Sequence, residues 1–184
     1  MKKVFISMFF MSLMTIGQQL NAQCNNSHRT TSYQKSHVDI VDIAISSDVH
    51  TTLVAAVKAA DLVQTLKSDG PFTVFAPTNI AFEKLPAGTV ETLLKPQNKN
   101  DLVEVLTYHV IPTRVSAENL IAAINAGGGE FVMKTVQGGQ LTATMKGNHV
   151  ILRDEKGRIS KITATDLNGT NGFVHVIDEV VLPG

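Results

Sequence analysis

The chain has 184 residues, of which 43% are hydrophobic, and this suffices for one domain with a sizeable core. Lysine plus arginine and aspartate plus glutamate both number 16, so the formal net charge is zero. This balance argues against a nucleic-acid partner, because nucleic-acid binders usually carry a basic surplus. Aromatic residues are few and tryptophan is absent, so the core must consist largely of Val, Ile, Leu and Ala.

The N-terminus has the pattern of an export signal. Met1–Lys3 supplies positive charge, residues 4–16 are uncharged and mostly apolar, and the small residue Ala22 lies in the polar stretch that follows. The apolar run is shorter than the roughly 18–20 residues that a membrane-spanning helix needs. We therefore predict a cleaved signal peptide over residues 1–22, export to the periplasm, cell surface or medium, and no membrane span in the mature chain. An uncleaved anchor is the alternative.

Cys24 is the single cysteine, so an intramolecular disulfide is excluded. Its position after the signal leaves two interpretations open, an ordinary thiol or a lipidated N-terminal cysteine. Lipid processing prefers a small residue before the cysteine, and Gln23 is not small, so the ordinary thiol is favoured. Residues 23–36 are polar and lack apolar periodicity, which predicts a flexible tether.

Helical periodicity dominates the first half of the remaining chain. Apolar spacing predicts helices near residues 38–45, 53–60, 62–66, 80–85, 90–94 and 101–106. Between them, Phe72–Ala76 alternates like a buried strand, and Pro77 ends it because proline cannot continue a hydrogen-bonded ladder. Thr78 or Asn79 can cap the short helix that carries Phe82.

The second half of the chain is rich in β-prone segments. Tyr108–Ile111 is strand-like and Ala117–Asn125 is a short amphipathic helix. Further strands are predicted near residues 131–136, 141–145, 150–153, 159–164 and 173–182, separated by turn sequences. Helices first and an antiparallel meander second predict an α+β fold.

Three blocks of the sequence resemble the fasciclin-like domain family. The first signature block is similar to residues 72–82, FTVFAPTNIAF, and the second to residues 171–183, NGFVHVIDEVVLP. The family's Tyr-His motif is similar to Tyr108-His109, and its usual second helix to Thr52–Ala60. The resemblance covers residues 37–184 as one domain. It implies a β-wedge or sandwich of short, mainly antiparallel strands with flanking helices, mostly N-terminal, in an extracellular bacterial module of adhesion or matrix attachment.

Nine positions of these blocks are expected to be structural. A buried carboxylate must be satisfied by hydrogen bonds, so we expect the Asp178 carboxylate to accept hydrogen bonds near Thr78 and Asn79. The nine are Phe75, Pro77, Thr78, Asn79, Phe82, Asn171, Gly172, His175 and Asp178.

Four residues are candidates for contact with a partner: Tyr108, His109, Asp166 and Leu167. On a strand, Tyr108 and His109 would point to opposite faces, which argues against a shared catalytic site with His109 as general base. The resemblance links this motif to fold stability and adhesion. It also places Asp166-Leu167 where animal members carry a pair implicated in integrin contact. The alternative is a strand end entering the loop 168–172; in a surface contact, Asp166→Ala should leave stability nearly intact.

No cofactor or metal site is expected. The six histidines show no ligand spacing, and the oxygens around Asp166, Asn168 and Asn171 depart from a calcium loop and lack its final glutamate. We expect a non-catalytic surface module that contacts protein or glycan partners, with a monomer as the default. The alternative is a structural envelope or biofilm-matrix protein that acts by self-association.

Overall fold

The computed structural model describes residues 38–184, so the expected signal peptide and the whole of the expected tether, including Cys24, lie outside the described part. This part is an α+β fold, and six of its seven α-helices precede β2, as predicted. The elements in chain order are α1 (Ile40–Ile45), η1 (Asp48–His50), α2 (Thr51–Ala59), α3 (Val63–Leu66), β1 (Phe72–Pro77), α4 (Asn79–Glu83), α5 (Thr89–Leu93), η2 (Pro96–Asn98), α6 (Lys99–Tyr108), β2 (Val110–Ile111), α7 (Ala117–Ala126), β3 (Glu130–Lys134), β4 (Gln140–Lys146), β5 (His149–Arg153), β6 (Ile159–Gly169) and β7 (Gly172–Ile177).

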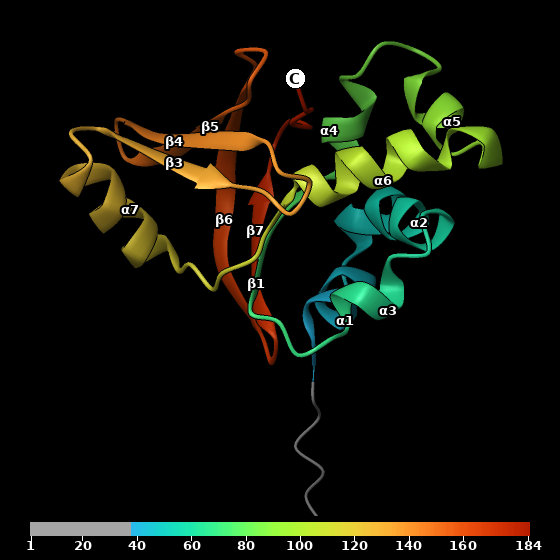
Figure 1. The fold of residues 1–184 in the computed structure, drawn as a ribbon, viewed down its shortest axis with the longest axis horizontal. Coiled ribbons are helices and arrows are strands. Elements are labelled where there is room, and N and C mark those ends of the chain that lie inside the picture. The colour runs from blue at the N-terminus through green and yellow to red at the C-terminus, as the bar shows by residue number, and fades with distance from the viewer. Residues whose placement is uncertain (1–37) are drawn as a thin grey trace, which may run out of the picture. The chain divides into compact units, whose positions relative to one another are not determined.

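The seven strands form one sheet in the order β2-β1-β7-β6-β5-β4-β3. Five of the six pairings are antiparallel, and β1 with β7 is the parallel one. The sheet bends strongly, so that β3, β4 and β5 run across the direction of β6, β7 and β1 (Figure 1). This confirms the expected wedge of short, mainly antiparallel strands.

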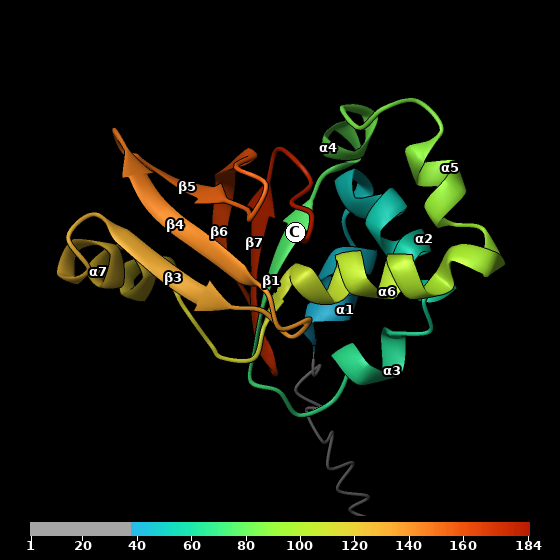
Figure 2. The ribbon, with the colours of Figure 1, turned by 45° about the horizontal axis from the view of Figure 1, so that its top comes forward.

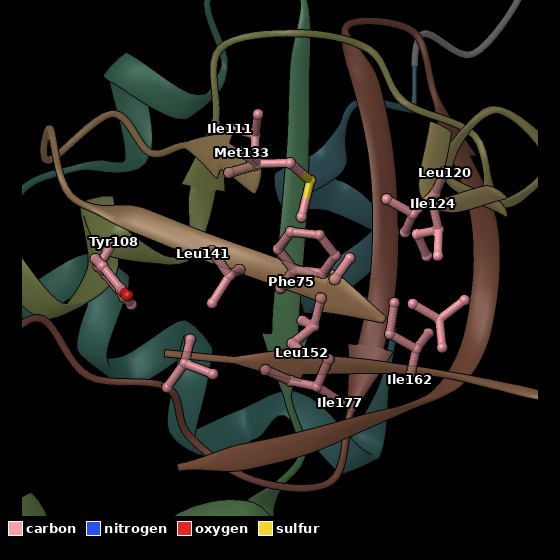
Figure 3. Packing of buried hydrophobic residues seen from close by; sticks show 13 residues of the cluster. Phe75, Tyr108, Ile111, Leu120, Ile124, Met133, Leu141, Leu152, Ile162 and Ile177 are labelled. Atoms are coloured by element: carbon pink, nitrogen blue, oxygen red, sulfur yellow. The ribbon is translucent and has the colours of Figure 1, made fainter. Parts of the chain in front are cut away.

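Strand β1 lies between two hydrophobic clusters. Phe75 is fully buried in the first cluster, which fills the bend of the sheet and is closed by Leu120 and Ile124 of α7 (Figure 3). Ala76 belongs to the second cluster, which β1 shares with α1, α2 and α6. Figure 2 shows helices α1–α6 gathered on one side of β1, and α7 with β3–β5 on the other. The expectation of a buried strand is therefore confirmed.

The prediction of a strand beginning at Tyr108 was wrong. Tyr108 is the last residue of α6, His109 is its C-cap with φ −82° and ψ −1°, and the strand begins at Val110. The helical repeat of Leu102 and Leu106 carries α6 through the aromatic residue. Tyrosine is common in strands because of how it packs, and here the packing of the buried face of α6, to which Leu102, Leu106 and Tyr108 belong, decides otherwise.

Strand β6 is longer than predicted and continues through Asp166 and Leu167 to Gly169. A two-residue turn, Thr170-Asn171, then connects it to β7. The alternative of a strand end entering a five-residue loop is therefore wrong. Among the helices of residues 38–184, none is long and apolar enough to cross a membrane.

Candidate functional site at the bulged end of strand β6

Strand β6 is irregular where it carries the candidate pair Asp166-Leu167. Its pairing with β7 shifts register between Ile162 and Ala164 and again between Ala164 and Leu167. Asp166 has φ +58°, a left-handed conformation that aspartate tolerates better than most residues. All six residues from Thr163 to Asn168 are exposed, and Leu167 is 36% exposed. Bulges of this kind commonly re-aim side chains.

The Asp166 carboxylate is bonded to the start of helix α7. Its Oδ1 accepts a hydrogen bond of 2.9 Å from the backbone N–H of Ala117, while Ser116 caps the same helix by accepting from Asn119. A carboxylate at a helix N-terminus is stabilised by the unpaired N–H groups and the helix dipole. We therefore expect a loss of stability when Asp166 is replaced, instead of the nearly intact stability expected from the sequence.

The buried imidazole of His175 on β7 contacts the backbone of the bulge, and its hydrogen bonds fit the neutral ring. Its Nε2 lies 2.9 Å from the carbonyl of Val115, and its Nδ1 lies 3.3 Å from the backbone N–H of Asp166. A carbonyl only accepts and an N–H only donates, so the proton is on Nε2. Burial lowers the pKa of His175, which agrees with this neutral tautomer. Both ring nitrogens are occupied, so this histidine is not free to act as a base.

Arg114 is a member of this site that no local sequence pattern indicates. Its guanidinium lies 4.4 Å from the centre of the Phe173 ring on β7, and it donates to Asn168 Oδ1 and to the carbonyl of Gly169. Thr73 on β1 holds the Arg114 segment in place, because its Oγ1 donates to the carbonyl of Thr113 at 2.6 Å and accepts from the N–H of Val115 at 2.8 Å. These contacts join residues about 40–59 positions apart, so only the folded chain brings them together.

Asn171 connects the turn after β6 to the N-terminal helices. Its side-chain Oδ1 accepts from the backbone N–H of Ile40 at 3.1 Å, and its Nδ2 donates to the carbonyls of Leu66 and Ser68, both at 2.8 Å. The residue is buried. Next to it, a Cβ on Gly172 would lie 2.2 Å from the carbonyl oxygen of Phe72, so only glycine fits between β1 and β7.

Tyr108 and His109 lie in the protein interior, away from the bulge. The Tyr108 hydroxyl donates to the carbonyl of Gln140 at 2.5 Å, and burial raises its pKa to about 12. His109 Nδ1 lies 2.8 Å from the carbonyl of Val105, and its Nε2 has no partner among the described residues. Burial lowers the pKa of His109 to about 4. Neither side chain belongs to an exposed surface that a partner could contact.

The first signature block is held by its own capping contacts. Thr78 caps α4 by accepting from the N–H of Ala81 at 3.2 Å, as expected. The Asn79 side chain accepts from Thr52 N at 3.0 Å and donates to Asp48 O at 3.1 Å. Pro77 is buried at the end of β1, and Phe82 packs against the second cluster.

The expectation that Asp178 accepts bonds near Thr78 and Asn79 was wrong. Its Oδ1 accepts from the backbone N–H of Lys161 at 2.7 Å. Asp178 follows the end of β7, which lies between β1 and β6. On the β1 side the backbone N–H of Thr78 donates to the carbonyl of Ile177, and the Asp178 carboxylate bonds on the β6 side instead.

The site has the character of a rigid surface strip, with its ionisable groups engaged in holding the fold. Within residues 38–184, no group of three or more His, Cys, Asp or Glu side chains is placed to hold a metal ion. His175 and Asp166, the two groups with acid–base chemistry at the bulge, each bond to backbone atoms of the segment 115–117. What the arrangement offers to a partner is the exposed edge of Thr163–Asn168.

Comparison with known proteins agrees with this architecture. The model of the Fasciclin domain matches residues 48–183. Protein sll1483 of Synechocystis is 47% identical over 150 residues, covering 80% of this chain and 75% of the relative. The transforming growth factor-beta-induced protein ig-h3 of Sus scrofa is 34% identical over 145 residues, 78% of this chain but 19% of that protein.

A solved structure of a FAS1 domain pair from the insect cell adhesion molecule Fasciclin I has the same fold. The TM-score is 0.54 at 18% sequence identity, over 71% of this chain and 43% of that one. The residues matched by the family model include both signature blocks, the bulge and Asn171. The chain therefore belongs to the fasciclin domain family.

Proposed function

We propose that this protein is exported and acts as a non-catalytic adhesion module, which contacts protein or glycan partners at the cell surface or in the surrounding matrix. The observation that carries the proposal is the exposed, rigidly held strip Thr163–Asn168 of a fasciclin domain. Protein interfaces commonly place apolar side chains at their centre and polar groups around the rim. Leu167 is such an apolar side chain.

Leu167 is the residue of the strip that we propose to contact the partner. Its neighbour Asp166 is held twice, through its backbone N–H by His175 and through its carboxylate by helix α7. On its other side, Asn168 accepts from Arg114. A contact residue held in this way loses little conformational entropy on binding, which favours affinity.

Asp166 has a positioning role in this proposal. Its carboxylate is engaged with Ala117, so its effect on binding passes through the conformation of the bulge. Tyr108 and His109 have no part in the contact, because both are buried. Support for an adhesive role comes from membership of the family and from the similarity of fold to an insect cell adhesion molecule.

The test is adhesion of protein-coated beads to cells and to matrix-protein and glycan arrays, with Leu167→Ser as the variant. Ile80→Ser is the matched control, because Ile80 is an apolar residue that is 64% exposed on α4. We expect Leu167→Ser to reduce bead retention at least fivefold and Ile80→Ser to leave it unchanged, with both variants folded. Equal retention by all three proteins would contradict the proposed contact. A protein that binds nothing but self-associates reversibly in sedimentation would favour the structural envelope role.

A further inference from the structure

Strands β3–β6 have an outer face that points away from the first hydrophobic cluster. Side chains alternate between the two faces of a strand, and Met133, Leu141 and Leu152 are buried on the inner one. Helix α7 packs on that inner side through Leu120 and Ile124. The strand register aligns the outer residues in two complete rows, Val132–Thr142–Arg153–Ile159 and Glu130–Thr144–Ile151–Lys161, flanked by the pairs Lys134–Gln140 and Lys146–His149.

This outer face is basic, although the chain as a whole is neutral. It carries one acidic side chain, Glu130, and four basic ones, namely Lys134, Lys146, Arg153 and Lys161. Glu130 is paired with Arg153 at 3.1 Å. The remaining three, Lys134, Lys146 and Lys161, form no ion pair with any residue of the range 38–184.

The same face offers groups that suit a sugar chain. Thr142 and Thr144 lie in the middle of the rows, where their hydroxyls stand on the outer face and are partly exposed. Val132 is 52% exposed and Ile159 is 55% exposed, which provides apolar contact for the C–H groups of sugar rings. Hydroxyls, lysines and aliphatic groups thus alternate over one surface.

We propose that this outer face binds an anionic polysaccharide, a sugar polymer that carries carboxylate or sulfate groups. The inference rests on the proposed adhesive function and adds a second surface, separate from the Leu167 contact, with its own class of partner. Neighbouring strands lie about 4.8 Å apart and alternate residues about 7 Å apart. The register therefore places Lys161 on the order of 8 Å from Arg153 and about 12 Å from Lys146, with Lys134 about 20 Å from both lysines. A polymer with regularly repeated negative charges can meet several of them at once.

Nucleic acid is the other polyanion that a basic face could attract, and the chemistry of this one favours a polysaccharide. Proteins that bind single strands place aromatic rings for bases to stack on, and none of the outward residues of the two rows is aromatic. The one arginine of this face, Arg153, donates from one guanidinium nitrogen to Glu130, which neutralises its charge locally.

The experiment measures the affinity of the purified exported protein for dextran sulfate, for neutral dextran and for duplex DNA of matched charge. The variant is Lys134→Gln/Lys146→Gln/Lys161→Gln. The control, Lys58→Gln/Lys95→Gln/Lys99→Gln, removes the same charge from the helical side of the domain. We expect the first variant to bind dextran sulfate at least tenfold more weakly and the control within twofold of the unchanged protein. Neutral dextran should not bind, and added salt should weaken binding to dextran sulfate.

Three results would overturn the inference: no binding to dextran sulfate, equal loss in both variants, or duplex DNA bound as tightly as dextran sulfate. Bead adhesion separates this inference from the proposed function. If the unchanged protein adheres but does not bind dextran sulfate, the inference is overturned and the proposed adhesive role stands. Loss of all adhesion, with dextran sulfate still bound through the three lysines, would overturn the proposed adhesive role and leave the assignment of the face standing.

Discussion

Replacing Asn171 should uncouple the β6–β7 turn from the N-terminal helices. The side chain is buried and makes hydrogen bonds to Ile40, Leu66 and Ser68 at 2.8–3.1 Å. Each net hydrogen bond contributes about 1 kcal/mol, and leaving its buried partner unsatisfied adds to the loss. We therefore expect Asn171→Ala to lower the free energy of unfolding by about 3 kcal/mol, or about 6–12 °C in Tm for a domain of this size.

Asn171→Asp sharpens this prediction because it keeps the shape and changes only the donors. A carboxylate can still accept from Ile40, but it faces the carbonyls of Leu66 and Ser68 where an NH₂ group donated. At pH 7 the aspartate variant should therefore be less stable than the alanine variant. Protonation restores one donor, so the difference between the two variants should shrink toward pH 4.

Urea unfolding of the two variants and the unchanged protein at pH 7 and pH 4 measures both effects. Asn171→Ala within 1 kcal/mol of the unchanged protein would refute the role given to these hydrogen bonds. An aspartate variant as stable as the unchanged protein at pH 7 would show that the two carbonyls find other donors.

Three further perturbations test the site and the core. Asp166→Ala should lower the free energy of unfolding by about 1–2 kcal/mol, because it removes the hydrogen bond to Ala117 and places alanine in a left-handed conformation that it tolerates poorly. Asp166→Asn should lose less than half of that, and equal losses for the two variants in urea unfolding would contradict this. Gly172→Ala should prevent folding or cost more than 3 kcal/mol, because the added Cβ meets the Phe72 carbonyl at 2.2 Å; a cooperative melt near that of the unchanged protein would disprove the close packing of β1 and β7. Burial lowers the pKa of His109 to about 4 in the folded protein, whereas the unfolded chain has a histidine pKa of about 6.5. As the pH drops from about 6.5 to about 4, the unfolded chain therefore binds the proton first, and the free energy of unfolding falls. This effect is about 3 kcal/mol and should be missing in His109→Asn, so parallel acid slopes of the two proteins would rule it out.

Local chemistry made much of the fold predictable from the sequence. Pro77 ended β1 and Thr78 capped α4 as expected, because proline cannot donate to a ladder and a threonine hydroxyl satisfies an unpaired N–H. The aromatic Tyr108 was one exception: its strand preference was weaker than the packing of α6, so the helix continued through it. Another was β6, which runs on to Gly169 where a loop was expected.

The sequence by itself determined which residues form most helices and strands, the family to which they belong, and the small set of positions on which the fold depends. Only the tertiary structure decided what Asp166, His175 and Arg114 do. Asp166 reaches a helix 49 residues away and His175 reaches a carbonyl 60 residues away, so their roles depend on how distant segments pack. The basic outer face arises in the same way, because only strand register brings lysines from β3, β4 and β6 onto one surface. Local propensities act over a few neighbouring residues, whereas hydrogen-bond partners and surface charge are set by contacts that form when the whole chain has folded.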